Sequence, residues 1–246
     1  MLTTQRQNGV AILTIDRPAR RNAICSELVA ALRAALAQHD GDPQTAALVL
    51  TGSPPGFCAG SDLKELATFD LAGMRAHEAD SAALARSIAQ LEKPVVAAVD
   101  GFALGGGLVL AASCDIVVTA PGARWHLPEV SIGWIPPWGL ETLTARVGPV
   151  LARRLTWGSE PFDGQEAHRI GIADYLAGGA ALAEAVAVAK RLAALPAPAV
   201  AATKRYFAQN ASCNGEAGDA LANRMFAENC RHEVAQATLK RFGVKA

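Results

Sequence analysis

Three consecutive glycines, Gly105 to Gly107, constrain the fold of this chain more than any other feature. They separate two apolar segments: residues 95–99 have the pattern of a short buried strand, and residues 108–112 that of a buried helix. Glycines at such a corner let the backbone turn sharply and come close to a ligand. The first N–H groups of the helix would lack intrahelical partners, so the corner is suited to a negatively charged oxygen.

The spacing of these glycines excludes two common phosphate-binding motifs. Leu110 occupies the position of the last glycine in a GxGxxG motif, and no Gly-Lys-Ser/Thr follows as in a P-loop. From this segment alone, a tight packing corner and an oxygen-binding corner are equally consistent with the residues.

Alternating strand and helix patterns predict an α/β core. Strands are expected at 10–15, 46–51, 95–99 and 116–118, with helices from Ser26 to about His39 and over 71–91. The last of these helices is sparsely apolar at its start, and we expect a mobile cover over a site. Residues 123–137 are expected to be irregular.

Helices dominate from residue 140 onward. They are expected at 140–147, 149–156, 163–169, 180–195, 197–210 and 216–230, with a short strand at 172–176. The pattern therefore predicts a core over residues 1–181 and a helical C-terminal region over 182–246.

The composition excludes several functional classes. The chain has 246 residues, 51% of them hydrophobic, which is enough for a sizeable core, and its 23 basic and 23 acidic residues cancel. We therefore expect no nucleic-acid or membrane-surface partner. Five cysteines without a CxxC pair argue against disulfides and a zinc site. With no secretory signal or membrane helix in the pattern, a cytoplasmic location is expected.

Five segments, in their order and spacing, resemble one protein family. They are Asp16-Arg17-Pro18 with Asn22-Ala23, Phe57 to Lys64, Lys93 to Gly107, Cys114-Asp115, and Leu127 to Val130 with Gly133 and Pro136. Together they resemble the crotonase (enoyl-CoA hydratase/isomerase) superfamily, and the resemblance covers nearly the whole chain. It implies an α/β fold built as a spiral of ββα turns. It also implies C-terminal helices that assemble homotrimers, often paired into hexamers.

The resemblance also implies a reaction on an acyl-CoA thioester. The backbone N–H groups of Ser61 and Gly106 match the two donors that hold the thioester oxygen as it becomes an enolate. Glu129 matches an acid/base residue. Coenzyme A is part of the substrate, so no further cofactor and no metal are expected.

One departure from the family pattern affects the predicted reaction. In two-glutamate hydratases of the family, one glutamate lies three residues after the oxyanion glycine and the other twenty residues later. Counting from Gly106, the first position is Val109 and the second is Glu129. A single carboxylate suffices to move a proton between two carbons, and some family hydratases work with one glutamate. The resemblance therefore predicts an isomerase or a single-glutamate hydratase.

Four other polar side chains are candidates to assist the reaction. His126 and Glu141 are candidates to replace the missing carboxylate, and His77 and Glu78 lie in the expected cover helix. For each of them a solvated or wall position is the preferred interpretation. Trp125, Trp134 and Trp138 fit either a narrow acyl pocket or core packing.

The candidates for binding coenzyme A are positively charged or C-terminal. They are Arg20, Arg21, Lys64, Lys240 and Phe242, the last two from a neighbouring subunit as in the family. A plain surface position is the alternative for each charge.

Two other functions compete with acyl-CoA chemistry. One is a serine hydrolase of related architecture that uses Ser61, although Ser61 is not in a GxSxG elbow. The other is a non-catalytic CoA-binding protein that lost its chemistry with the first glutamate; the presence of Glu129 argues against it.

Overall fold

A six-stranded sheet forms the centre of the computed structural model, which describes residues 1–158 and 160–242, without the side chains of 209–214. The strand order is β1-β2-β3-β4-β6-β8. Strands β1 and β2 are antiparallel, and all other neighbours are parallel. The strands are β1 (Leu2–Gln7), β2 (Val10–Ile15), β3 (Ala47–Gly52), β4 (Val95–Val99), β6 (Ile116–Thr119) and β8 (Tyr175–Leu176). A second, two-stranded parallel sheet joins β5 (Phe102–Leu104) to β7 (Arg124–His126).

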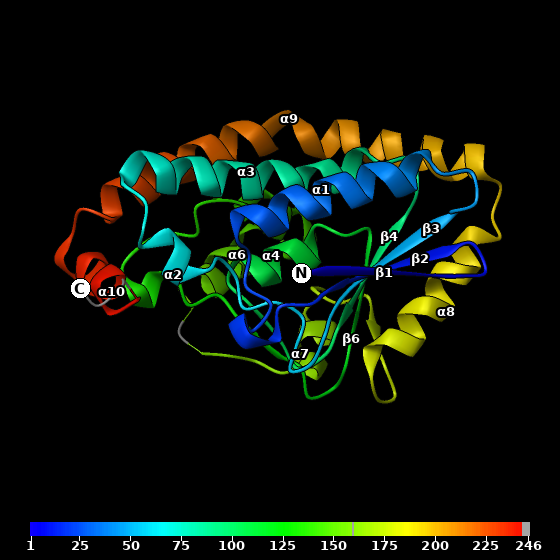
Figure 1. The fold of residues 1–246 in the computed structure, drawn as a ribbon, viewed down its shortest axis with the longest axis horizontal. Helices are drawn as coiled ribbons and strands as arrows, with labels where there is room; N and C mark the ends of the chain where they lie inside the picture. The colour runs from blue at the N-terminus through cyan, green and yellow to red at the C-terminus, as the bar shows by residue number, and fades with distance from the viewer. Residues whose placement is uncertain (159, 243–246) are drawn as a thin grey trace.

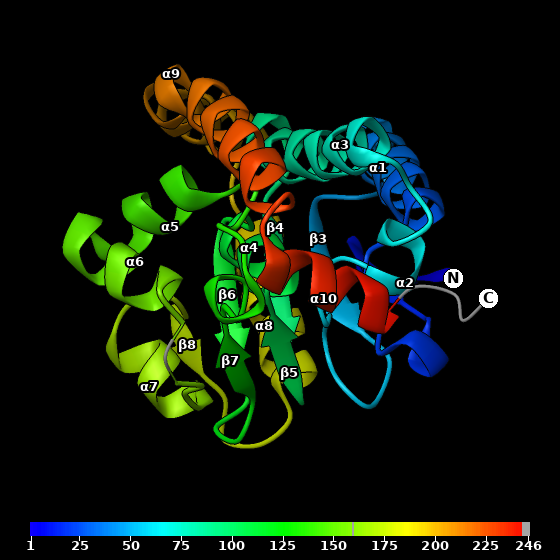
Figure 2. The same ribbon diagram turned by 90° about the vertical axis from the view of Figure 1, so that its left-hand side faces the viewer.

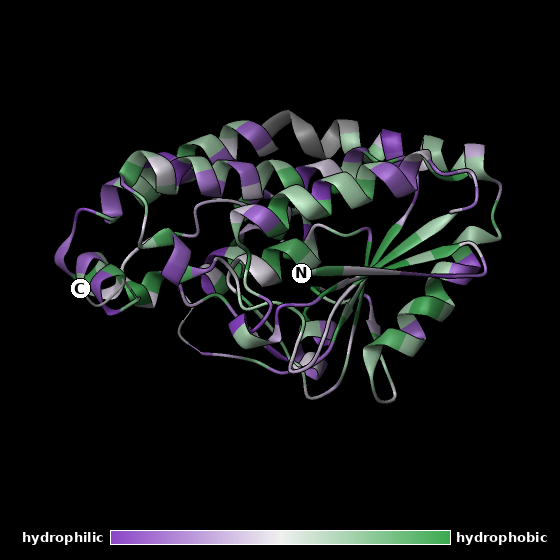
Figure 3. Ribbon diagram, viewed as in Figure 1, coloured by the Kyte–Doolittle hydropathy of each residue, from purple (hydrophilic) through white to green (hydrophobic). Residues whose placement is uncertain are grey.

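Helices cover both faces of the central sheet, which explains why β3 and β4 are continuous apolar runs. Helices α1 (Ser26–Gly41), α3 (Leu71–Gln90) and α4 (Gly106–Ala112) pack on one face, which includes Leu48 and Ala97. Helix α8 (Ala181–Ala193) packs on the other face, on alternate residues such as Val49 and Val96. Figure 1 shows α1 and α3 above the strands and α8 below them. In Figure 3 strands β3 and β4 and much of α8 have the green of hydrophobic residues.

The C-terminal helices lie against the N-terminal half of the chain. Helix α9 (Ala197–Asn229) runs beside α3, joined to it by the Arg86–Asp219 ion pair and by Arg75 Nε, which donates to Asn223 Oδ1 at 3.1 Å. Helix α10 (Glu233–Phe242) packs against the short α2 (Leu63–Leu66), and Figure 2 shows the two side by side.

The remaining helices form one side of the molecule in Figure 2. They are α5 (Leu140–Val147), α6 (Pro149–Thr156) and α7 (Gly164–Arg169). The short 3-10 helices η1 (Pro18–Arg20) and η2 (Val130–Ile132) lie in the loops that lead toward the site.

Most predicted elements are confirmed; β5 and α10 were not predicted, and four further differences follow. The helix predicted from Ser26 is capped by Cys25, whose Sγ accepts from the Leu28 N–H at 3.4 Å. The break predicted near residues 211–215 is wrong, because α9 continues through it alongside α3. The region 123–137, which was expected to be irregular, contains η2 and also β7, which is a strand because it pairs with β5. Strand β1 was not predicted, because its residues are largely exposed and polar and its pairing with β2 forms it.

Three further features concern the described residues alone. Cys25, Cys58, Cys114 and Cys230 are free and buried, while the side chain of Cys213 lies outside the described part. No group of three or more His, Cys, Asp or Glu side chains there is arranged to hold a metal ion. No single described helix is long and apolar enough to cross a bilayer; only α8 taken together with Ala197–Ala208, at a bend of 109°, meets that criterion.

Candidate active site

The loop that carries Ser61 lies against the start of α4. A Cβ atom on Gly60 would be only 3.1 Å from the backbone nitrogen of Gly106. Ile24 fixes this loop, because its N–H donates to Gly60 O at 2.8 Å and its carbonyl accepts from Asp62 N at 2.7 Å. The Ser61 N–H therefore faces away from Ile24. Among the described residues, neither the Ser61 nor the Gly106 N–H has a hydrogen-bond acceptor, so the structure brings two free donors close together.

The glycines at this corner are required by close approach. Gly105 has φ of +54°, and a Cβ there would lie 2.6 Å from Glu129 Oε1. A Cβ on Gly106 would lie 2.8 Å from Cζ2 of Trp138. The backbone thus admits a carboxylate and an indole ring directly beside the two donors.

Side chains from the first loop brace this arrangement. Arg17 forms an ion pair with Asp62 at 3.1 Å and donates to the carbonyl of Ala23. Asp62 in turn caps α2 by accepting from the N–H groups of Lys64 and Glu65. The Asp16-Arg17-Pro18 segment therefore positions the Ser61 loop, a role that its sequence pattern does not reveal.

Glu129 is a buried carboxyl group beside the glycine corner. Its exposed fraction is 7%, and its Oε2 has no hydrogen-bond partner among the described residues. Burial raises the pKa of Glu129 to about 8; its own backbone N–H opposes the shift and the charge of Glu78 adds to it. A strongly shifted carboxyl group in a pocket is a candidate acid/base residue.

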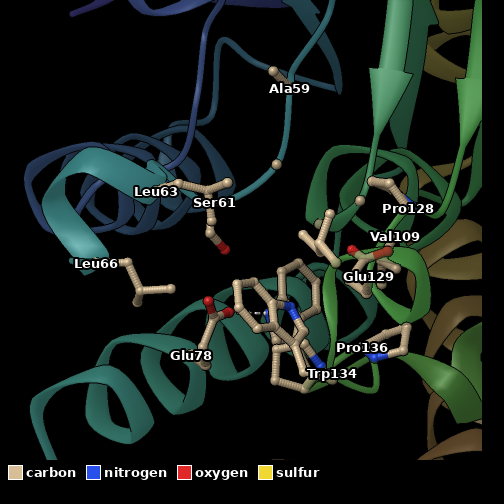
Figure 4. Close-up of a pocket in the computed structure, with 16 residues that line it drawn as sticks. Ala59, Ser61, Leu63, Leu66, Glu78, Val109, Pro128, Glu129, Trp134 and Pro136 are labelled. Atoms are coloured by element: carbon tan, nitrogen blue, oxygen red, sulfur yellow. Dashed lines mark hydrogen bonds between the residues drawn. The ribbon is translucent and has the colours of Figure 1, made fainter. Parts of the chain in front are cut away.

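A pocket of about 80 Å³ opens between the Ser61 loop and Glu129 (Figure 4). Its apolar walls come from Leu63 and Leu66 on α2, from Val109 on α4, and from Trp134 and Trp138. Val109 is held tightly, because a Cβ on Gly139 would lie 1.9 Å from its Cγ1. The walls and the small volume suit a short acyl group.

Glu78 is a second carboxylate in this pocket, and the preferred interpretation of it as a solvated helix residue is wrong. It is 2% exposed, and its Oε2 accepts from Nε1 of Trp138 at 2.8 Å. Burial raises the pKa of Glu78, opposed by the charge of His77 and by the hydrogen bond from Trp138. Figure 4 shows Glu78 and Glu129 at different sides of the pocket.

A periodic signal in α3 points to the buried position of Glu78. Met74, Ser81 and Ala82 are buried three or four residues from it and Ala85 seven residues from it, which places Glu78 on the covered face. His77 is also buried, contrary to the solvated interpretation, and its Nδ1 lies 3.3 Å from Ser26 Oγ; it does not line the pocket.

The two proposed replacements for the missing glutamate lie elsewhere. The Nε2 of His126 is 2.9 Å from the carbonyl of Gly158. Glu141 is exposed and packs its side chain against Gly218 of α9. Neither lines the pocket.

The three tryptophans divide between pocket and core. Trp134 and Trp138 form pocket walls. Trp125 is fully buried in the core, where its Nε1 donates to Thr119 Oγ1 at 3.0 Å.

The candidate CoA-binding residues lie at the surface. Arg20, Arg21 and Lys64 are exposed, and the Arg21 guanidinium lies 4.6 Å from the centre of the Phe102 ring. Lys240 is exposed and Phe242 is half-buried on α10, which packs against α2 of its own chain. The structure thus places Lys64 and Lys240 on neighbouring elements.

Comparison with known proteins identifies the family. The family model described as enoyl-CoA hydratase/isomerase matches residues 5–245. The chain belongs to the enoyl-CoA hydratase/isomerase family. It is 34% identical over 246 residues to the 2,3-dehydroadipyl-CoA hydratase of Escherichia coli (strain K12), covering 98% of this chain and 96% of that protein. It is 35% identical over 170 residues to the crotonyl-CoA hydratase of Syntrophomonas wolfei, covering 68% and 65%.

The fold agrees with this assignment. A crystal structure of an enoyl-CoA hydratase/isomerase from Mycobacterium paratuberculosis matches with a TM-score of 0.88 at 28% identity, covering 98% of this chain and 97% of that one. The predicted crotonase fold is confirmed, and the protein is an enzyme of the enoyl-CoA hydratase/isomerase family. A serine hydrolase would need a histidine beside Ser61, and among the described residues none lines this pocket.

Proposed function

We propose that this enoyl-CoA hydratase/isomerase family enzyme acts on a short acyl-CoA thioester through an enolate, with Glu129 as the main proton-transfer residue. The observation that carries the proposal is the buried, unpartnered carboxyl group of Glu129 beside the free N–H groups of Ser61 and Gly106. The thioester oxygen would accept from both N–H groups, which are in place before negative charge develops on it.

Glu129 can then move a proton at the carbon next to the thioester. As a base it removes a proton from C2 or C4 of an enoyl group and returns it to the other carbon, which isomerises the double bond. As an acid it protonates C2 when water adds at C3. A pKa of about 8 makes both protonation states accessible near neutral pH.

The outer part of the substrate would bind near α2 and α10. Arg20, Arg21, Lys64 and Lys240 offer positive charge to the phosphates of coenzyme A, and Phe242 offers an apolar surface to its adenine. Two observations support these assignments. The charged side chains are exposed, and Lys64 and Lys240 lie on α2 and α10, of which α2 forms one side of the pocket.

Glu129→Gln tests the assignment. It keeps the shape of the side chain and removes the acid/base group, so kcat should fall by about 10²-fold or more, whereas binding of an acyl-CoA should remain. Turnover of a panel of acyl-CoA substrates is followed by mass spectrometry, because hydration adds one water and isomerisation leaves the mass unchanged. Glu141→Gln, at an exposed glutamate, is the control. Near-normal turnover by Glu129→Gln would contradict the proposal.

A further inference from the structure

Glu78 is held in the pocket by a hydrogen bond. The Nε1–H of Trp138 donates to its Oε2 at 2.8 Å, and Ser61 lines the pocket with these two residues. Both neighbours line the same pocket, so the carboxylate is oriented at the place where an acyl group would bind. Burying a carboxylate is costly, and an arrangement that fixes it beside a substrate site calls for a function.

A purely structural ion pair does not account for this burial. No lysine or arginine lines the pocket, and no ion pair of Glu78 occurs among the described residues. The titratable groups that act on it or feel its charge are His77 on α3, Glu129 before η2, and Cys230 at the end of α9. Glu129 alone of these lines the pocket with it.

We propose that Glu78 is a second catalytic carboxylate, which holds and deprotonates the attacking water in the hydration of a short 2-enoyl-CoA. Helix α3 thereby supplies the carboxylate that position 109 lacks. This inference rests on the proposed function, in which Ser61 and Gly106 hold the enolate and Glu129 transfers the other proton.

The step balances when Glu78 begins ionised and Glu129 begins protonated. Ionised Glu78 takes a proton from water while the water oxygen bonds to C3. The C2–C3 π electrons move toward the thioester, whose oxygen becomes the enolate. Protonated Glu129 then gives its proton to C2 as the carbonyl re-forms. One water has been added, and the proton left on Glu78 returns to Glu129 by exchange with solvent.

The hydrogen bonds support this division of roles. The indole N–H of Trp138 donates to Glu78 and stabilises its ionised form, whereas Oε2 of Glu129 has no donor among the described residues. The pKa of about 8 for Glu129 keeps it protonated at neutral pH, as the acid in this step must be. Two carboxyl groups whose surroundings favour different protonation states are a recurrent acid/base arrangement.

Two reactions of the same protein separate this inference from the proposed function. Hydration of crotonyl-CoA requires both carboxylates, whereas isomerisation of a 3-enoyl-CoA requires only the enolate site and Glu129. Glu78→Gln should lose at least about 10²-fold in hydration and keep isomerisation within a few fold. Glu129→Gln should lose both. Ser81→Ala, at a buried position one turn further along α3, is the matched control and should keep both.

A second variant tests Glu78 through its ionisation. Trp138→Phe keeps an aromatic ring and removes the N–H donor that stabilises ionised Glu78. The low-pH limb of the pH–rate profile for hydration should therefore move to higher pH, whereas Ser81→Ala should leave it unchanged. Unchanged hydration in Glu78→Gln, or an unmoved limb in Trp138→Phe, overturns the inference. A wild-type enzyme that isomerises but does not hydrate overturns it and leaves the proposed function standing. A wild-type protein that catalyses neither reaction overturns both the inference and the proposed function.

Discussion

At the scale of single residues, the site depends on burial. Among the described residues Glu129 and Glu78 belong to no ion pair, and burial raises the pKa of each. Val109 is part of that wall and is packed against Gly139. The protein thus buries two carboxyl groups in one pocket at a cost in stability, which is expected where chemistry rather than stability selects the residues.

The raised pKa of Glu129 predicts how stability depends on pH. Because its folded-state pKa of about 8 exceeds its ordinary value of 4.5, the folded state favours the protonated form. Stability from this group is present below pH 4.5 and is lost as pH rises to about 8, at about 1.4 kcal/mol for each pKa unit. The free energy of unfolding of Glu129→Gln should therefore exceed that of the wild type by a few kcal/mol at pH 9. At pH 5 the difference between the two proteins should be much smaller. Urea unfolding at both pH values measures this, with Glu141→Gln as control; an equal difference at both pH values would refute it.

At the scale of elements, α10 supports one wall of the pocket. Leu239 on α10 packs in a cluster with Leu66 of α2, Trp134 and Phe226. The Trp134 and Phe226 rings meet edge to face at 5.6 Å. Thr238 Oγ1 also donates to the carbonyl of Ile132 in η2 at 3.0 Å. The last helix therefore holds pocket residues that lie far from it in the sequence.

Leu239→Ala should loosen α10 and with it the pocket wall. Truncation of a buried leucine costs about 2–5 kcal/mol, and at a terminal helix this loss is expected as local opening. Hydrogen exchange should become faster over residues 233–242 and 63–66, and KM for the acyl-CoA should rise. Val234→Ala on the same helix is the control, since Val234 is 59% exposed. Identical exchange in the two variants would show that the cluster does not hold α10.

At the scale of the whole molecule, several large apolar side chains face outward. Trp157 is 62% exposed and Phe207 65%, and Val150 and Leu195 are also exposed. They lie on α6, α9 and the segments next to them, and exposed apolar groups of this size are common in subunit interfaces.

We therefore predict a homotrimer or a dimer of trimers, as in the family the chain resembles. Light scattering at micromolar concentration measures the mass directly, and a monomer would contradict the prediction. Phe207→Glu should shift the protein toward monomers, because a charge would be buried in the interface. Ala37→Glu, at an exposed position of α1, is the control and should leave the mass unchanged.

Local patterns were sufficient for the elements around the glycine corner. The strand at 95–99, the helix that follows the glycines and the spacing from Gly106 to Glu129 are all encoded within short segments, because burial on both sides of a parallel sheet leaves an unbroken apolar run. The order of the motifs likewise indicated the family. These features depend on neighbours along the chain, and the sequence displays those directly.

Tertiary packing alone decided which polar side chains enter the pocket. The sequence shows that Glu78 belongs to a helix, but the packing of α1 and α9 against α3 determines which face of that helix is buried. The same packing carries α9 through the predicted break, and pairing with β2 makes β1 a strand. A helix position has no burial of its own until another element covers it, so the second carboxylate of this site becomes visible only in the folded chain.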